Sequence, residues 1–93
     1  MVIGACRLEL RLEEPFSLKD KRRILKSLLA RLQSRLNVAA AEVGSQDEWR
    51  RAELGIVTVA NEAASVDRTL AAAVRLVESD GRAVLAGYET WLA

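Results

Sequence analysis

The segment 16–37, FSLKDKRRILKSLLARLQSRLN, constrains the fold most strongly, because its apolar residues return at helical spacing. Ser17 is a typical N-cap residue, and Asp20 is placed to bond back to the Ser17 amide, as in a capping box. The apolar stripe comprises Leu18, Ile24, Leu25, Leu28, Leu29, Leu32 and Leu36. We therefore predict a helix that packs one face against a β-sheet.

Four cations occupy the opposite, outer face of this helix, on a wheel of about 100° per residue. They are Lys19, Arg22, Arg23 and Lys26. Two interpretations stay open: a solvated helix face, or a fixed array that contacts a phosphate backbone. Lys21 faces the sheet side instead. Its side chain either extends past the sheet edge or places its ammonium near the loop that contains Asp47.

The remaining segments predict four strands and a second helix. The expected elements are a strand at 2–12 ended by Pro15, the helix at 17–36, strands at 38–43 and 52–61, a helix capped by Ser65 and stopped by Gly81, and a strand at 83–92. The order βαββαβ is that of a ferredoxin-like plait. We predict an α+β domain spanning residues 1–93, with a four-stranded antiparallel sheet and both helices on one face.

In the predicted sheet, one face is open, and for one strand the sequence does not decide which residues point inward. In strand 52–61 both parities are apolar, which is typical of a central strand covered on both sides. For strand 83–92, the inward set is either Leu85, Gly87 and Trp91 or Val84, Ala86 and Tyr88. Because Ile3 and Ala5 lie on the outer parity of the first strand, the uncovered face should carry an apolar patch, and we expect a homodimer.

Composition limits the compartment and the partners. The net charge of +1 gives no general attraction to nucleic acid or to an anionic membrane. Eleven of the fourteen cations are Arg, which suits a thermophile or a GC-rich genome. The lone Cys6 is expected to be a buried thiol, which fits a reducing cytoplasm. No apolar stretch is long enough to cross a membrane, and no secretion signal is evident, so we expect a cytoplasmic protein without membrane contact.

The sequence offers few groups for catalysis. Without His and with a single Cys, we expect no nitrogen or sulfur metal cluster and no Cys-His or Ser-His nucleophile. The glycines form no phosphate-binding loop, and the adjacent acids Glu13 and Glu14 are expected to be solvated. We therefore predict no catalytic residues, no cofactor, no metal and no enzymatic activity.

Aromatic residues restrict the type of nucleic acid contact. The first and third strands carry no aromatic side chain on which a base could stack, in contrast to an RNA-recognition-motif sheet. Contact with structured RNA or with its backbone is therefore favoured. Trp49, in a polar loop, is interpreted either as a lid on the edge of the core or as an anchor for another molecule.

Three segments, SLKDKRRILKSLL (17–29), NVAAAEVGSQDEWRRAELG (37–55) and VTVANEAASVD (57–67), resemble the YlxP-like family of small bacterial proteins, a domain of unknown function. The resemblance implies a ferredoxin-like plait without established enzymatic activity, and a role near the ribosome, because family members are often encoded beside transcription and translation factors. The matching motif positions are Ser17, Leu18, Lys19, Lys21, Arg22, Glu42, Asp47, Trp49, Arg51 and Gly55. The last strand departs from the family by carrying Tyr88 and Trp91.

Three functional hypotheses follow. The leading one is a binding protein whose basic helix contacts ribosomal or ribosome-precursor RNA. The alternative is a homodimeric interaction module that uses the open sheet face and has no nucleic-acid role. The third is a small-molecule or enzymatic plait, against which the absent His and glycine loop argue.

Overall fold

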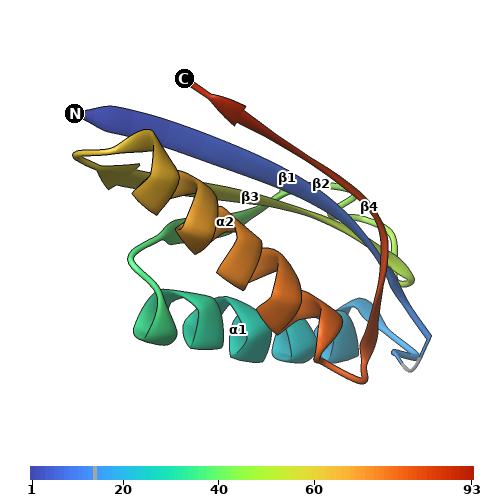
Figure 1. The fold of residues 1–93 in the computed structure, drawn as a ribbon. Coiled ribbons are helices and arrows are strands. Elements are labelled where there is room, and N and C mark those ends of the chain that lie inside the picture. The colour runs from blue at the N-terminus through green and yellow to red at the C-terminus, as the bar shows by residue number, and fades with distance from the viewer. Residues whose placement is uncertain (14) are drawn as a thin grey trace.

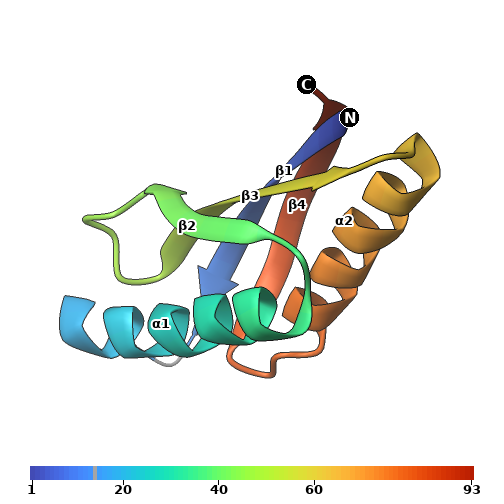
Figure 2. The ribbon, with the colours of Figure 1, turned by 90° about the vertical axis from the view of Figure 1, so that its left-hand side faces the viewer.

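The computed structural model describes residues 1–13 and 15–93 and has the predicted order of elements (Figure 1). The elements are β1 (Val2–Leu12), α1 (Leu18–Arg35), β2 (Ala39–Gly44), β3 (Arg51–Ala60), α2 (Ala63–Glu78) and β4 (Ala83–Leu92). The strands form one sheet in the order β2-β3-β1-β4, and every neighbouring pair is antiparallel. Both helices lie on the same face of this sheet (Figure 2). The predicted ferredoxin-like plait is confirmed.

The core lies between the helix layer and the sheet. Alternate residues of β1 point inward and are buried, from Cys6 to Leu12, as the period-two pattern predicts. The buried residues that α1 contributes are Lys21, Ile24, Leu25, Leu28 and Leu32. Leu29 is partly buried and packs against the core. The apolar stripe of α1 therefore faces β-structure, and its cationic side faces outward.

Helix α2 begins two residues before the predicted cap, so the expectation for Ser65 is wrong. The N-cap is Glu62, whose side chain makes no capping bond, and Ser65 Oγ accepts a hydrogen bond from Arg68 at 3.1 Å. At the other end, Ser79 is the C-cap in a right-handed helical conformation. No glycine in the described part of the chain has a positive φ, so Gly81 does not stop α2 as a left-handed cap.

Strand β3 is central, but only one of its faces is covered, contrary to the sequence expectation. Its inward residues are buried, whereas Val57 and Val59 are 46% and 45% exposed. They pair with Ala5 and Ile3 of β1, and Ala5 also pairs with Trp91 of β4. The helices occupy one side of the sheet only, so these side chains form the predicted apolar patch on the open face.

The inward parity of β4 changes along the strand, because the register shifts between Glu9 and Leu10 of β1. Leu85 pairs with Leu10 and Tyr88 with Leu8, and both β1 partners point into the core. The bulge thus places Leu85 from one predicted set and Tyr88 from the other on the helix side, so neither set alone was right. No helix in the described residues is long and apolar enough to cross a membrane.

Candidate functional site

The candidate site is built on the N-terminal turn of α1. Ser17 is the N-cap, as predicted, and its Oγ accepts a hydrogen bond from the Asp20 amide at 3.1 Å. The return bond differs from the prediction: Asp20 Oδ2 accepts from the amide of Phe16 at 3.2 Å, one residue before the cap. Leu18 is only partly buried at the start of the helix. These bonds fix the direction in which the next residues of α1 point.

Lys21 is the most unusual side chain of this turn, because it is 1% exposed. Its Nζ donates to the carbonyl oxygens of Ser45 and Glu48, each at 2.6 Å, and lies 2.9 Å from Glu42 Oε2. Two of the three N–H donors of this ammonium group therefore have a carbonyl acceptor, and the Glu42 carboxylate adds an ion pair. Of the two interpretations of Lys21, the one that places its ammonium at the loop with Asp47 is confirmed.

Glu42 supplies the charge that compensates Lys21. It lies on the inward side of β2, opposite Leu54 of β3, and its side chain is 20% exposed. The Oε2 atom is buried, and within the described ranges its polar contact is the ion pair with Lys21 and not a hydrogen bond. Lys21 and Glu42, which both belong to the motif of the family resemblance, therefore form one ion pair that joins α1 to β2.

The loop 45–50 is shaped by the same lysine. Ser45 has a φ of 56°, and its carbonyl oxygen also accepts from the amide of Glu48 at 3.1 Å. A positive φ is uncommon for a residue with a side chain, and such a conformation needs support from its surroundings. Because Lys21 holds carbonyl groups at both ends of this turn, it fixes the backbone immediately before Trp49.

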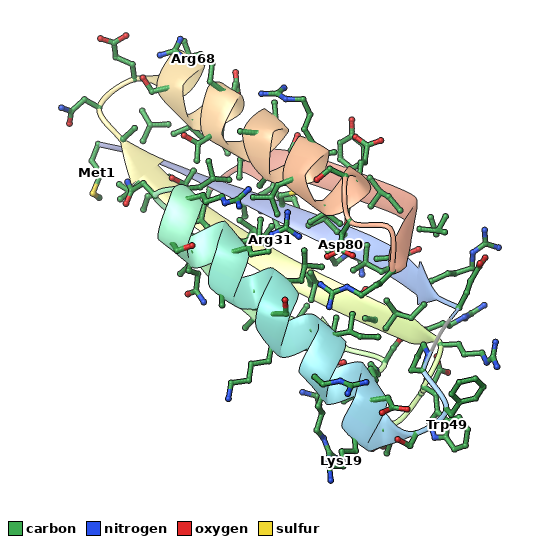
Figure 3. The ribbon with its side chains drawn as sticks, turned by 90° about the horizontal axis from the view of Figure 1, so that it is seen from below. Met1, Lys19, Arg31, Trp49, Arg68 and Asp80 are labelled. Carbon is green, nitrogen blue, oxygen red and sulfur yellow. The ribbon has the colours of Figure 1, made fainter. Side chains whose placement is uncertain are left out.

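Trp49 is 48% exposed and lies outside the core and outside the partly buried side chains packed on it in the described chain. About half of the Trp49 side chain is therefore open to another molecule. A shallow hollow of about 410 Å³ is lined by Glu48, Trp49, Arg50 and Arg51. Trp49 and Lys19 lie at the same end of α1 (Figure 3).

The four outer cations Lys19, Arg22, Arg23 and Lys26, which we call the basic ridge, are all exposed. Arg23 forms an ion pair with Asp20 at 3.3 Å, and its side chain remains 76% exposed. An exposed pair of this kind contributes little to stability, so it leaves Arg23 available. The other three ridge cations have no ion pair within the described residues.

The remaining motif residues have different positions. Asp47 is exposed in the loop, and Arg51 is exposed at the start of β3. Gly55 lies on the open face, where a Cβ atom would meet Cγ1 of Val43 at 3.0 Å. The motif thus separates into residues that hold the loop against α1, residues exposed on the loop, and a glycine that gives room to a neighbouring strand.

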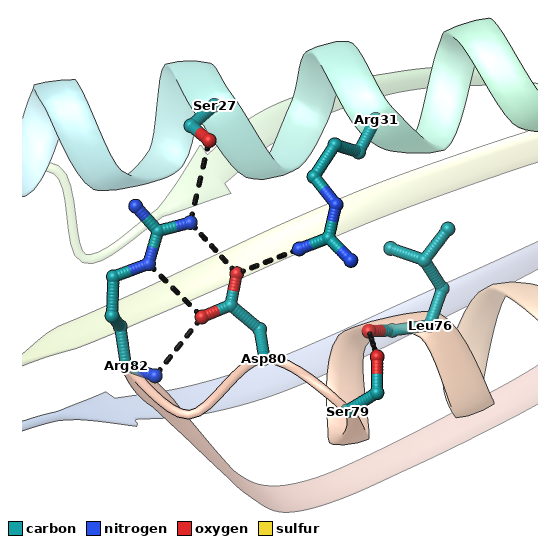
Figure 4. Close-up of polar contacts among 6 residues, drawn as sticks. All are labelled: Ser27, Arg31, Leu76, Ser79, Asp80 and Arg82. Carbon is teal, nitrogen blue, oxygen red and sulfur yellow. Dashed lines mark hydrogen bonds and ion pairs between the residues drawn. The ribbon is translucent and has the colours of Figure 1, made fainter.

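Sequence reasoning did not identify a second charged cluster, between the two helices (Figure 4). The buried Asp80 accepts from Arg82 Nε at 3.0 Å and Nη2 at 2.8 Å, and from Arg31 Nη1 at 3.1 Å. Arg82 Nη2 also lies 3.3 Å from Ser27 Oγ of α1. The hydrogen bonds from Arg82, with the charges of Arg82 and Arg31, hold the pKa of Asp80 below its ordinary value, although burial opposes that shift.

The described residues contain no group of three or more His, Cys, Asp or Glu side chains that could hold a metal ion. The thiol of Cys6 is buried in β1, and this burial raises its pKa. A buried thiol with a raised pKa is a poor nucleophile.

Comparison with known proteins identifies one family. The family model described as "Protein of unknown function (DUF503)" matches residues 3–90. The chain is also 33% identical over 78 residues to the "Uncharacterized protein YlxP" of Bacillus subtilis (strain 168). That match covers 84% of this chain and 85% of the Bacillus protein.

Proposed function

Since the chain belongs to the DUF503 family, for which no activity is named, we propose from the structure that it is a non-enzymatic, cytoplasmic binding protein that contacts the phosphate backbone of structured RNA. The observation that carries the proposal is the basic ridge: four exposed cations on two turns of one rigid helix. A fixed array of cations suits a phosphate backbone, because each ion pair releases condensed counterions. The family resemblance supports ribosomal or ribosome-precursor RNA as the ligand.

The charge distribution supports a local site. The whole chain carries 14 basic and 13 acidic side chains, so a general attraction to RNA is absent. Among the described residues, one acid, Asp20, forms an ion pair with one of the four cations of the ridge. Binding should therefore depend on the orientation of α1 and on salt.

The test is co-sedimentation with ribosomal particles and titration of a structured RNA over a series of salt concentrations. The variant replaces Lys19, Arg22, Arg23 and Lys26 by Ala. The matched control replaces four exposed arginines elsewhere, Arg11, Arg35, Arg68 and Arg75, by Ala, so both variants lose four positive charges. We expect the ridge variant to lower the slope of log K against log salt by about 3, at roughly 0.7–0.9 per lost phosphate contact, and the control to change it by less than about 1. Equal decreases of the salt slope in the two variants would show that the basic ridge is not the RNA-binding site.

A second candidate function, a homodimeric interaction module, is favoured by the open sheet face. Val57 and Val59 of β3 and Trp91 of β4 are each almost half exposed there, and β1 lies between these two strands. The patch is bounded by Arg7, which forms ion pairs with Glu53 at 2.7 Å and Glu89 at 3.0 Å across the sheet. A self-complementary apolar patch with a polar border suits an isologous contact. Sedimentation velocity at micromolar concentration tests it, and a monomer at all concentrations would argue against this function.

A further inference from the structure

Two exposed aromatic side chains, Phe16 and Trp49, lie near the N-terminal end of α1. Phe16 precedes the N-cap and is 76% exposed. Trp49 follows Glu48, whose carbonyl is bound by Lys21 in the first turn. Both rings are therefore accessible to another molecule.

Each aromatic ring is accompanied by arginine. Trp49 shares its hollow with Arg50 and Arg51. Phe16 lines a second hollow of about 550 Å³ with six neighbours, Glu13, Pro15, Asp20, Arg23, Ile24 and Arg82. An aromatic ring beside guanidinium groups is the arrangement that binds unpaired nucleotides, because the base stacks on the ring and the cation meets the phosphate.

The acids in these hollows show where the electrostatic attraction originates. Glu48 shares the Trp49 hollow with Arg50 and Arg51, and Asp47 is adjacent in the loop, so these two acids offset the two arginines and leave no excess of positive charge. The attraction must come from the basic ridge on the same helix end. The aromatic rings then add contact with bases, which a ridge of cations cannot provide.

The rigidity of the loop also favours stacking. Lys21 fixes the carbonyls of Ser45 and Glu48 at 2.6 Å each, directly before Trp49. A ring on an ordered backbone loses little conformational entropy when it binds, which strengthens stacking. Lys21 is thus a positioning residue for Trp49.

We propose that the end of α1 binds the junction between an RNA helix and unpaired nucleotides, with the ridge on the helical backbone and Trp49, with Phe16, stacking on unpaired bases. This inference rests on the proposed function and narrows its ligand class. It explains how a plait whose β1 and β3 carry no aromatic residue could still contact bases. The bases would be bound at the helix end and not on the sheet.

Tryptophan fluorescence tests the proposal, because the chain has only two Trp residues. In a Trp91→Phe background, Trp49 is the sole reporter. The probes are a blunt RNA duplex and the same duplex extended by a single-stranded adenosine tail, both at low salt. We expect the tailed RNA to quench Trp49 emission and the blunt duplex to leave it unchanged.

Binding measurements on variants complete the test. Trp49→Ala should weaken binding of the tailed RNA by about tenfold, the size expected for one lost stack, and leave the blunt duplex within about twofold. Trp49→Phe should restore most of the affinity, since it keeps a ring. Phe16→Ala should act in the same direction as Trp49→Ala.

Each other outcome overturns the inference in a distinguishable way. If both RNAs bind the wild type through the ridge, with no quenching and no effect of Trp49→Ala, base stacking is wrong and RNA backbone binding stands. Trp49 would then be left as a contact for a protein. If neither RNA binds the wild type, both this inference and the proposed function fail.

Discussion

At the scale of single residues, the most consequential side chain is Lys21. A buried ammonium is costly unless it is fully compensated, and here two carbonyl oxygens and one carboxylate surround it. The same three contacts join α1, β2 and the following loop. One lysine therefore links the fold of this region to the position of its exposed Trp49.

We expect Lys21→Met to destabilise the protein by about 3 kcal/mol, because it leaves Glu42 Oε2 buried without a partner and frees two carbonyls. Urea unfolding at neutral pH measures this. The control is Lys26→Met on the same helix, where the side chain is exposed and the change should stay within about 0.5 kcal/mol. Similar effects of the two substitutions would show that the three contacts contribute little.

The lowered pKa of Asp80 predicts how the stability of the protein changes with pH. Its pKa is lowered in the folded protein, so its ion pairs contribute stability above the ordinary Asp pKa and lose it as pH falls through the lower folded value. Asp80→Asn should therefore be less stable than the wild type near pH 7. The difference in unfolding free energy should narrow as the pH falls below about 4.

Thermal or urea unfolding of the wild type and Asp80→Asn at several pH values measures that difference. All other carboxylates are common to the two proteins, so they serve as the internal control. A difference that stays constant from neutral to acidic pH would mean that the charge of Asp80 is not its source.

The sequence predicted which face of an element a residue lies on better than it predicted which residues that side chain contacts. Helical spacing places Lys21 on the sheet side, but the carbonyls that it binds belong to Ser45 and Glu48, more than twenty positions later. Arg31 and Asp80 are separated by 49 positions, and only the packing of the two helices brings them together. Such contacts depend on how the elements pack in the folded chain, and local sequence patterns do not predict that packing.

At the scale of elements, periodicity predicted most of the fold. The six elements and their order follow from hydrophobic spacing, because burial of one face is what forms them. The errors lie where contacts with other elements determine the local structure. The bulge in β4 follows from its pairing with β1, and α2 begins before Ser65. The approach of α2 to β1 was also not predicted, and it depends on Gly4.

We expect Gly4→Ala to destabilise the protein by about 1–3 kcal/mol through overpacking. A Cβ atom at this position would collide with the side chain of Val66 and lie 3.2 Å from Leu70 Cδ1, both on α2. Gly81→Ala is the control, since a Cβ atom there meets nothing within 4 Å and its φ is not positive. Thermal unfolding should show a lower Tm for Gly4→Ala alone. Equal Tm values for the two variants would show that α2 moves away without cost.

At the scale of the whole molecule, the two candidate surfaces lie on opposite sides of one sheet. Both helices cover one face of the sheet (Figure 2). The basic ridge is on the exposed side of α1, and the apolar patch is on the opposite face of the sheet. Because the sheet and the core separate them, occupation of one surface should not block the other. A dimer formed through the sheet faces would carry two ridges directed outward.

This separation predicts that the two surfaces can be altered independently. Val57→Thr with Val59→Thr should reduce any self-association, since it removes apolar surface from the patch while keeping residues that favour strands. Its affinity for a structured RNA under monomeric conditions should stay within about twofold of the wild type, because these valines do not touch α1. Conversely, the ridge variant should lose RNA and keep the sedimentation behaviour of the wild type. Sedimentation velocity and RNA titration of both variants provide the measurements, and loss of RNA binding in the valine variant at wild-type stability would mean that the open sheet face itself contributes to the RNA site.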